Sequence, residues 1–501
     1  MTYLQTPRIS DIVKPNELNS AHAIVKIRLI KYPSHIMLDM VFKGIRATHS
    51  AIGFPSGTFL SILVLGLAIR FALIPFFTYP YDIEHWAIIM QNSESGNALF
   101  GLTGYFYTPV WGYLLNLGSF FLNSFLTIGE YGSRFADLFG IEGLHNIFYT
   151  ATTTSPAFNC AIKIPLVIVD VVVGYLLYRL IMHDTEDVRK ATAGFGLWFL
   201  CPVVIYMSSV QATFDCICAL VTILSLLLLR NDRCFLAGAM LALAALTKFF
   251  PAFLAILFCI YVIKVHENDG KKYVKLTEGV IGAAFMFALM VFPQVLDGTL
   301  ANDFTFVSDR MSESSLLEWS SKTIEILALL FVMIYTAIRM YKGSGETVKQ
   351  KLFFYSLAVL AASVLMRIGP QYSITFLPLL AYFAVIGNRH YKIGFIVIGI
   401  IAMLAGFMNN SLSLLTTAVE YYGMWDVTSL INAMEMLDMA LFDSTVQAQI
   451  ISLLNIVQRV TIILLLLFMW EEDYDGKRFA KFRSVLVKVR TVLTRCNDEG
   501  A

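Results

Sequence analysis

Charged residues are scarce in this chain of 501 residues: they make up 15% of it, whereas hydrophobic residues make up 57%. A soluble domain usually carries about 25% charged residues, so the composition excludes an ordinary soluble enzyme. The formal net charge is only +1, which excludes a strongly basic nucleic-acid-binding protein. The phosphate-binding loops GxGxxG and GxxxxGK are also missing, so we expect no nucleotide cofactor.

The seven cysteines follow no metal-ligand or disulfide spacing. Cys216 and Cys218 are two residues apart, so they would point to different sides of a helix. The other cysteines are scattered along the chain, mostly in or beside apolar blocks. We therefore interpret the cysteines as small core residues.

What the sequence does have is long apolar blocks of about 20 residues, the length a helix needs to cross a hydrocarbon core of about 30 Å. About twelve such blocks predict an all-α, polytopic membrane protein whose transmembrane domain covers 58–470. The predicted spans lie near 58–78, 162–180, 192–209, 214–229, 234–249, 251–264, 277–293, 323–340, 352–369, 373–387, 393–409 and 450–470.

Lys and Arg are distributed unevenly among the segments between these spans. If the N-terminal segment 1–57 lies in the cytosol, 29 of the 37 Lys and Arg residues fall on the cytosolic side and six on the opposite side. The other two, Arg70 and Arg459, lie within spans. Because positive residues gather in cytosolic loops, we expect both termini in the cytosol.

One apolar block, 105–128, is not counted as a span, because counting it would place the basic loops outside. We therefore expect a long first outer loop, 79–161, with helices that lie on or re-enter the membrane. In the C-terminal tail, 471–501, apolar residues recur at helical spacing and Lys and Arg fill the other face. This pattern predicts a cytosolic amphipathic helix on anionic lipid.

Polar residues from four separated segments would meet at the outer side of such a bundle. Charges inside or at the edge of a span are costly, so each is a functional candidate. A cavity open to the outer leaflet would bring these side chains together. The candidates are Asp82, Glu84 and His85 after the first span, Asp215 at the start of the fourth, Lys248 at the end of the fifth, and Arg367, Gln371 and Tyr372 between the ninth and tenth.

These candidates also have simpler structural interpretations. Asp82 and Glu84 could be solvated loop charges, and His85 could be structural rather than a metal ligand. Lys248 and Arg367 could extend to the lipid headgroups.

Two further features are better explained by structure than by chemistry. Asp170, in the middle of the second span, is expected to pair inside the bundle, with Arg70 as its plausible partner. The aromatic run at 105–113 is typical of an interface belt, although such rings also stack on sugars.

Four groups of motifs, taken in order, carry a family resemblance. They are Asp82-Ile83-Glu84; Tyr107-Thr108-Pro109 followed by Trp111-Gly112-Tyr113-Leu114-Leu115; Cys201-Pro202 to Asp215; and Lys248-Phe249-Phe250-Pro251 with Gly369-Pro370-Gln371-Tyr372. Over roughly 58–390 the chain resembles the GT-C superfamily of membrane glycosyltransferases that use polyprenyl-phosphate sugars. In particular, it is similar to the catalytic subunit of GPI mannosyltransferase I and its prokaryotic relatives. The departures are Glu84 where that family often has Asp, Cys201 in place of Asn, and Val210 in place of Gly.

The resemblance implies an inverting transfer of a hexose, with mannose expected, from a polyprenyl (dolichyl) phosphate to a lipid-linked or glycan acceptor. The site would face the extracytoplasmic side of a prokaryotic plasma membrane or of the endoplasmic reticulum membrane. A small partner subunit is compatible with this family.

Residue roles follow from the same resemblance. Asp82 would act as the catalytic base, and Glu84 would assist acceptor binding or share a Mg²⁺ or Mn²⁺ ion with it. Lys248 and Arg367 would hold the leaving phosphate. The remaining substrate-binding residues would be Gln371, Tyr372, Tyr107, Asp215 and His85.

Two other classes of protein stay open. A secondary transporter or lipid flippase would also have about twelve spans, but transporters usually show two similar halves, which we do not find here. A non-catalytic assembly subunit would predict that Asp82 is dispensable.

Overall fold

The structure is a computed structural model of the whole chain. The chain divides into two compact units, Met1–Ser56 and Gly57–Ala501, and all the elements named below belong to the second. The predicted tail helix beyond 474 lies outside the described residues. These residues are 56–79, 82–83, 86–87, 89–90, 108–122, 132–134, 152–299, 316–410, 414–424 and 444–474.

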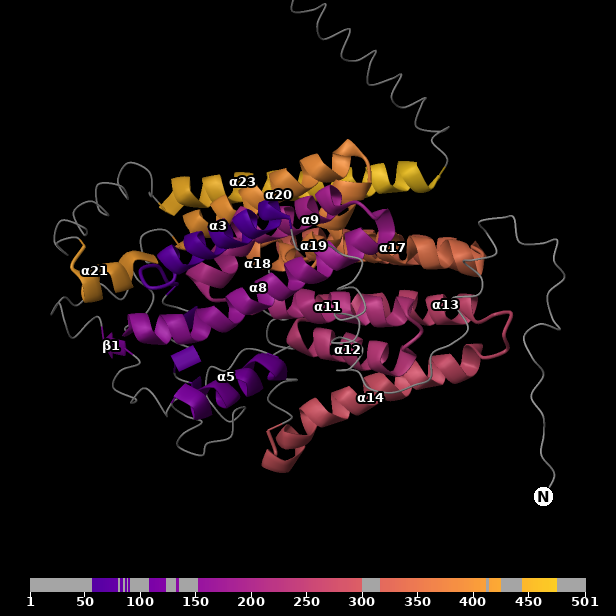
Figure 1. The fold of residues 1–501 in the computed structure, drawn as a ribbon, viewed down its shortest axis with the longest axis horizontal. Helices are drawn as coiled ribbons and strands as arrows, with labels where there is room; N and C mark the ends of the chain where they lie inside the picture. The colour runs from indigo at the N-terminus through magenta and orange to yellow at the C-terminus, as the bar shows by residue number, and fades with distance from the viewer. Residues whose placement is uncertain are drawn as a thin grey trace, which may run out of the picture. The chain divides into compact units, whose positions relative to one another are not determined.

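The second unit is helical apart from one short ladder (Figure 1). In that ladder β1 (Gly132–Arg134) pairs antiparallel with β2 (Thr152–Thr154). The helices are α3 (Gly57–Leu73), α5 (Pro109–Leu122), α8 (Pro156–Thr185), α9 (Val188–Phe199), α10 (Pro202–Ile205), η4 (Tyr206–Gln211), α11 (Asp215–Arg230), α12 (Cys234–Thr247), η5 (Phe250–Leu254), α13 (Ala255–Val265), α14 (Lys272–Asp297), α16 (Leu316–Lys342), α17 (Gly345–Leu365), α18 (Pro370–Ser373), α19 (Leu377–Ile386), α20 (Arg389–Asn410), α21 (Thr416–Tyr422) and α23 (Ser444–Asp473).

Six of the described helices are long and apolar enough to cross a membrane, and the bent pair of α9 with α10–η4 would make seven. The six are α8, α14, α16, α17, α20 and α23. This confirms the expectation of an all-α, multi-pass membrane protein. Every predicted span coincides with a described helix or helix pair, but several of these helices are shorter than 18 residues. The number twelve therefore stays a prediction.

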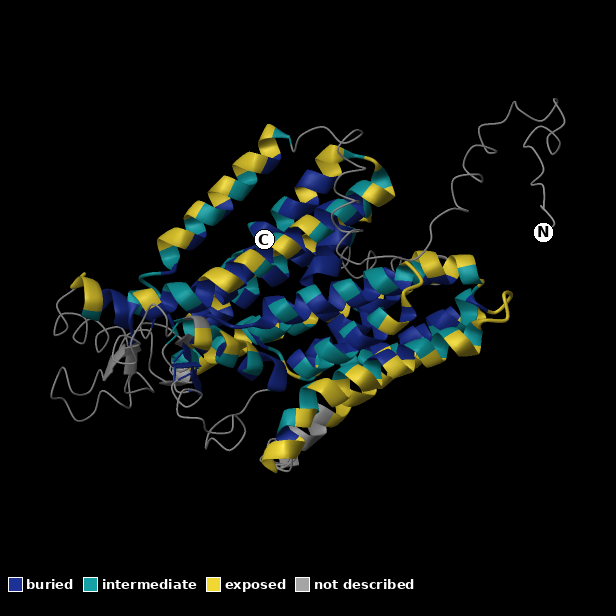
Figure 2. Ribbon diagram, turned by 60° about the horizontal axis from the view of Figure 1, so that its bottom comes forward, coloured by how far each residue is buried: buried dark blue, intermediate teal, exposed yellow. Residues whose placement is uncertain are grey.

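Helix α17 forms the core of the bundle. In its most apolar stretch 83% of the residues are buried, against 17% in α14 and in α23. It packs against α11, α13, α16, α19 and α23, and each of its own residues from Leu352 to Leu365 is buried. Buried residues accordingly gather inside the bundle and exposed ones on peripheral helices (Figure 2). A helix that is apolar all round is stable in such a surrounded position or within a membrane.

Helix α14 presents a wide apolar surface outward. Five of its large apolar side chains are each more than half exposed: Val280, Ile281, Phe285, Leu289 and Phe292. An apolar surface of this extent is not soluble in water, whereas it is well solvated by lipid chains. We conclude that this side of the bundle faces hydrocarbon.

Glycines allow α12 and α14 to approach closely. A Cβ atom on Gly238 would lie 2.0 Å from the carbonyl oxygen of Gly279, and one on Gly282 would lie 1.9 Å from that of Phe235. Small residues at such a crossing are typical of membrane helix pairs, whose association depends on close backbone packing.

The predicted pairing of Asp170 with Arg70 is confirmed. Arg70 Nη2 lies 3.1 Å from Asp170 Oδ2, and both side chains are completely buried. Arg70 Nη1 also donates to the carbonyl of Phe199 at 2.8 Å, and Trp198 Nε1 donates to the carbonyl of Asp170 at 2.9 Å. These contacts connect α3, α8 and α9, which agrees with a structural role for the pair.

Two acidic residues connect helices at the end of the bundle that is predicted to be cytosolic. Arg230 donates to both carboxylate oxygens of Asp184, at 2.9 and 2.6 Å, which joins α11 to α8. Asp473 at the end of α23 accepts from Arg339 Nε at 2.7 Å and from Lys351 Nζ at 2.9 Å. Bidentate and paired contacts of this kind fix the relative positions of helix ends.

Candidate functional site

The candidate site forms where helices are interrupted. The span predicted at 192–209 is divided: α9 and the α10–η4 helix meet at an angle of 50°, with Pro202 at the first position of α10. The helix continues as the π-helical turn η4, and Ala212 then adopts a left-handed conformation with φ of 64°. Such π-helical turns are frequent at functional sites. They place Gln211 and Asp215 on the two sides of one sharp turn.

Gln211 binds the first predicted catalytic residue. Its Nε2 atom donates to Asp82 Oδ2 at 3.2 Å, and the two residues are 129 positions apart in the chain. Gln211 is buried and Asp82 is half-buried. The amide donor fixes one carboxylate oxygen of Asp82 without neutralising its charge.

Asp215 and Lys248 form an ion pair beside this contact. Lys248 Nζ lies 2.7 Å from Asp215 Oδ1, the aspartate side chain is completely buried, and the lysine side chain is 17% exposed. Asp215 is the first residue of α11, where the helix dipole favours a negative charge. Lys248 follows α12 in an extended conformation. The structure therefore brings these two predicted substrate-binding residues into direct contact.

The carboxylate of Asp215 has the Lys248 ammonium as its donor, whereas the buried Gln211 Oε1 has no hydrogen-bond donor among the described residues. Buried acceptors are nearly always satisfied in proteins, and exceptions call for an explanation such as a bound ligand or water. A hydroxyl group of a ligand would satisfy Gln211 Oε1.

Aromatic rings surround the lysine. Lys248 Nζ lies 5.1 Å from the ring centres of both Phe214 and Tyr372. The Arg367 guanidinium lies 5.5 Å from the ring centre of the same tyrosine, Tyr372. Phe250 packs edge-on against Tyr372 at 5.2 Å. The two predicted phosphate-binding cations therefore share one tyrosine ring, which cation–π attraction would stabilise.

A second aromatic group supports the turn from the other side. Trp86 Nε1 donates to the carbonyl of Ala212 at 3.1 Å. Trp111 of α5 stacks on Phe214 with ring centres 5.0 Å apart, and Trp86 packs edge-on against Trp111 at 5.5 Å. These rings hold the left-handed turn in place and connect α5 to it.

The sequence-predicted residues are therefore placed as follows. Five of them take part in the contacts above: Asp82, Asp215, Lys248, Arg367 and Tyr372. Gln371 lies beside them in α18 and is half-buried. Glu84, His85 and Tyr107 lie outside the described residues. The functional role of each residue stays a prediction.

Sequence reasoning did not assign a role to Gln211 or Phe214, although both lie in the turn that organises the site. Gln211 was recognised only as part of a motif. Pro202 is a signal for the preceding bend between α9 and α10, since a proline within a predicted span interrupts its hydrogen bonds, but it does not indicate the turn at Ala212.

A metal ion shared by Asp82 and Glu84 also stays a prediction, because only Asp82 is described. Within the described ranges, Asp232, Cys234 and His266 form the group that could hold a metal ion. In that group His266 Nε2 lies 2.9 Å from Asp232 Oδ1, and Lys275 Nζ lies 3.6 Å from Asp232 Oδ2. The neighbouring ammonium group favours reading this cluster as an ion-pair network between loops.

Comparisons with known proteins add no assignment. No family model matches the sequence, and no curated protein matches it significantly. The resemblance described above therefore stays a prediction.

Proposed function

We propose that the chain is a membrane glycosyltransferase that transfers a hexose, with mannose expected, from a polyprenyl (dolichyl) phosphate to a lipid-linked or glycan acceptor. The observation that carries the proposal is the group of contacts at the Ala212 turn, where Gln211 binds Asp82 and Asp215 binds Lys248. A sugar supplies a hydroxyl donor for Gln211 Oε1, which has no donor among the described residues. The nearby rings suit a sugar ring as well as a cation.

Asp82 is the proposed general base. Its carboxylate takes the proton of the acceptor hydroxyl while that oxygen attacks the anomeric carbon of the donor. The bond from the anomeric carbon to the phosphate oxygen breaks, and its electron pair leaves with the polyprenyl phosphate. Attack from the face opposite the leaving group inverts the configuration.

Lys248 and Arg367 are the proposed phosphate-binding cations. A leaving phosphate gains charge in the transition state, and positioned cations stabilise that charge. Asp215 orients the Lys248 ammonium, so it acts as a positioning residue for the phosphate and as an acceptor for a sugar hydroxyl. The proposed binding site is completed by five further residues: Glu84, His85, Gln371, Tyr372 and Tyr107.

The proposed topology places both termini in the cytosol and the site on the extracytoplasmic side. The membrane would be the plasma membrane of a prokaryote or the endoplasmic reticulum membrane. The polyprenyl chain of the donor would lie in the bilayer, and a small partner subunit would be compatible with the fold.

A transporter or flippase is the second candidate, and one observation favours it. The 50° bend between α9 and α10–η4 resembles the discontinuous helices that form transporter binding sites. The polar residues here come from the ends of α11, α12 and α17, however, and not from the middle of long spans.

Reconstituted protein distinguishes these functions. Purified protein in liposomes is supplied with radiolabelled polyprenyl-phosphate mannose or glucose and a crude lipid acceptor pool. Label in the acceptor fraction supports the transferase. Movement of donor across the bilayer without transfer of label supports the flippase and overturns the proposal.

A further inference from the structure

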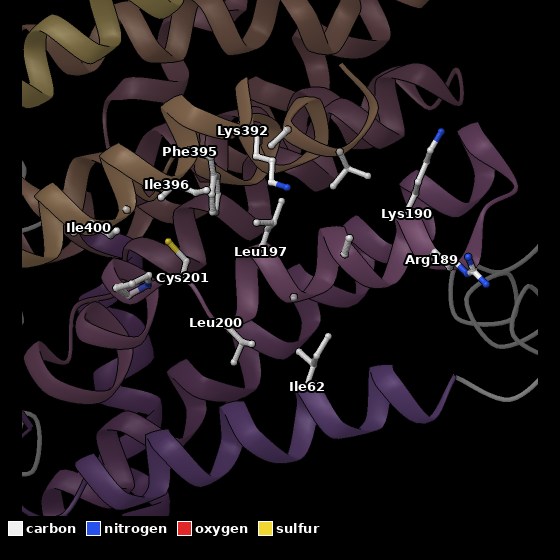
Figure 3. Close-up of a pocket in the computed structure, with 16 residues that line it drawn as sticks. Ile62, Arg189, Lys190, Leu197, Leu200, Cys201, Lys392, Phe395, Ile396 and Ile400 are labelled. Atoms are coloured by element: carbon white, nitrogen blue, oxygen red, sulfur yellow. The ribbon is translucent and has the colours of Figure 1, made fainter. Parts of the chain in front are cut away.

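A cavity lies between α9 and α20, with α3 and α19 at its sides (Figure 3). Its volume is about 670 Å³. Ile62, Leu197, Leu200, Phe395 and Ile396 contribute to a mainly apolar lining. A cavity of this kind on a membrane protein is suited to lipid chains.

Three cations lie along this cavity. Arg189 and Lys190 lie in the first turn of α9, and Lys392 lies one turn into α20. All three residues are exposed. None of them makes an ion pair within the described part of the chain, and no acidic residue lines the cavity. The nearest carboxylate in sequence, Asp187, accepts hydrogen bonds from the backbone N–H groups of Arg189 and Lys190.

The length of the cavity corresponds to one leaflet. It follows α9 from Arg189 to Leu200 and α20 from Lys392 to Ile400. At 1.5 Å per residue these stretches span about 16 and 12 Å. Half of a hydrocarbon core of about 30 Å is about 15 Å. An acyl chain whose headgroup is held at the first turns of α9 and α20 would therefore end near the middle of the membrane.

We infer that this cavity is a binding site for an anionic glycerophospholipid. Its phosphate would be held by Arg189, Lys190 and Lys392, and one acyl chain would lie between α9 and α20. These residues lie at the end of the bundle with the α8–α9 and α19–α20 turns, which the topology proposed above places in the cytosolic leaflet. The cavity shares the break at Cys201–Pro202 with the candidate site, but none of the residues that make the contacts at the Ala212 turn lines it. The inference does not depend on the proposed transfer activity.

Basic residues bind anionic membrane surfaces with about 1 kcal/mol each, so loss of all three should weaken binding about 100-fold. The test variant is Arg189→Gln, Lys190→Gln and Lys392→Gln together. The matched control is Lys271→Gln, Lys342→Gln and Lys349→Gln, which removes the same charge elsewhere in predicted cytosolic segments.

Native mass spectrometry of the full chain, exchanged into detergent with either phosphatidylglycerol or phosphatidylcholine of the same acyl chains, measures the retained lipid. Wild type and control should retain more phosphatidylglycerol than phosphatidylcholine, and the triple variant should lose that preference. Ala193→Trp, which fills the cavity without removing charge, should lower retention of both lipids.

Three results would overturn the inference. Equal retention by the triple variant and the control would remove the cations from lipid binding. Equal retention of the two lipids by wild type would show that charge is not recognised. Photocrosslinking from Ala193 to the segment 1–55, with no lipid retained, would show that the chain fills its own cavity.

Discussion

Lys248 Nζ lies 2.7 Å from Asp215 Oδ1 at a point where two helices are interrupted. Asp215 begins α11, and Lys248 immediately follows α12. The aspartate is completely buried, whereas the lysine keeps 17% of its side chain exposed. The pair therefore extends from the buried interior of the bundle, where Asp215 lies, to the edge of the candidate site, where Lys248 is partly exposed.

Removing the lysine alone should be costly. Lys248→Met leaves the buried Asp215 carboxylate without its cation, which should destabilise the protein by about 3–5 kcal/mol. Combining Lys248→Met with Asp215→Asn should recover part of this loss, because the uncompensated charge is then removed. Thermal unfolding in detergent measures both variants. Equal unfolding temperatures for the single and double variants would contradict a coupled pair.

Arg70→Met should act in the same way within the bundle. It leaves Asp170 buried and uncompensated and removes the donor to the carbonyl of Phe199, for an expected loss of about 3–5 kcal/mol. Adding Asp170→Asn should restore part of the stability. Because neither residue of this pair takes part in the contacts of the candidate site, the double variant should keep the substrate affinity of wild type if it folds. Loss of affinity with wild-type stability would count against a purely structural role.

Gly238→Val tests the close contact of α12 with α14. The first atom of the new side chain would lie 2.0 Å from the carbonyl oxygen of Gly279, so the helices must separate, at a cost of about 1–3 kcal/mol or more. Gly394→Ala is the matched control, since its Cβ would meet only Leu465 Cδ1 at 3.8 Å. The unfolding temperature should be lower than that of wild type for Gly238→Val. For Gly394→Ala it should be unchanged or slightly higher. Similar effects of the two would show that the crossing tolerates a larger residue.

Cysteine labelling tests the predicted orientation. Asn268 lies between α13 and α14 and is exposed, and Asp297 is exposed at the opposite end of α14. In membrane vesicles of known sidedness, an impermeant thiol reagent should label Asn268→Cys from the cytosolic side and Asp297→Cys from the other. The reverse pattern would invert the topology and move the candidate site to the cytosol.

Hydropathy and charge predicted the helical membrane architecture because a span must be apolar and about 20 residues long. They also predicted the pairing of Arg70 with Asp170, since two charges inside a bundle are stable only together. The break at Cys201–Pro202 was not predicted. Both halves of that segment are apolar, and hydropathy does not register a bend.

The candidate site was predicted only as a collection of residues at one depth. The contact of Asp215 with Lys248 depends on where α11 begins and α12 ends, and element boundaries are the least reliable part of a sequence reading. The contact of Gln211 with Asp82 spans 129 residues and depends on the left-handed turn at Ala212. A non-glycine residue rarely adopts that conformation, so the alanine at this position does not indicate a left-handed turn.

The most direct test of the proposed function is the rate of sugar transfer by Asp82→Asn, measured in liposomes with saturating polyprenyl-phosphate mannose. Asp297→Asn is the matched control, an exposed aspartate outside the site. If Asp82 is the general base, its variant should lose about 100-fold to 10,000-fold in rate while the control keeps the wild-type rate. Equal transfer by Asp82→Asn and wild type would contradict the role of Asp82, and no transfer by wild type with any polyprenyl-phosphate sugar would contradict the transferase itself.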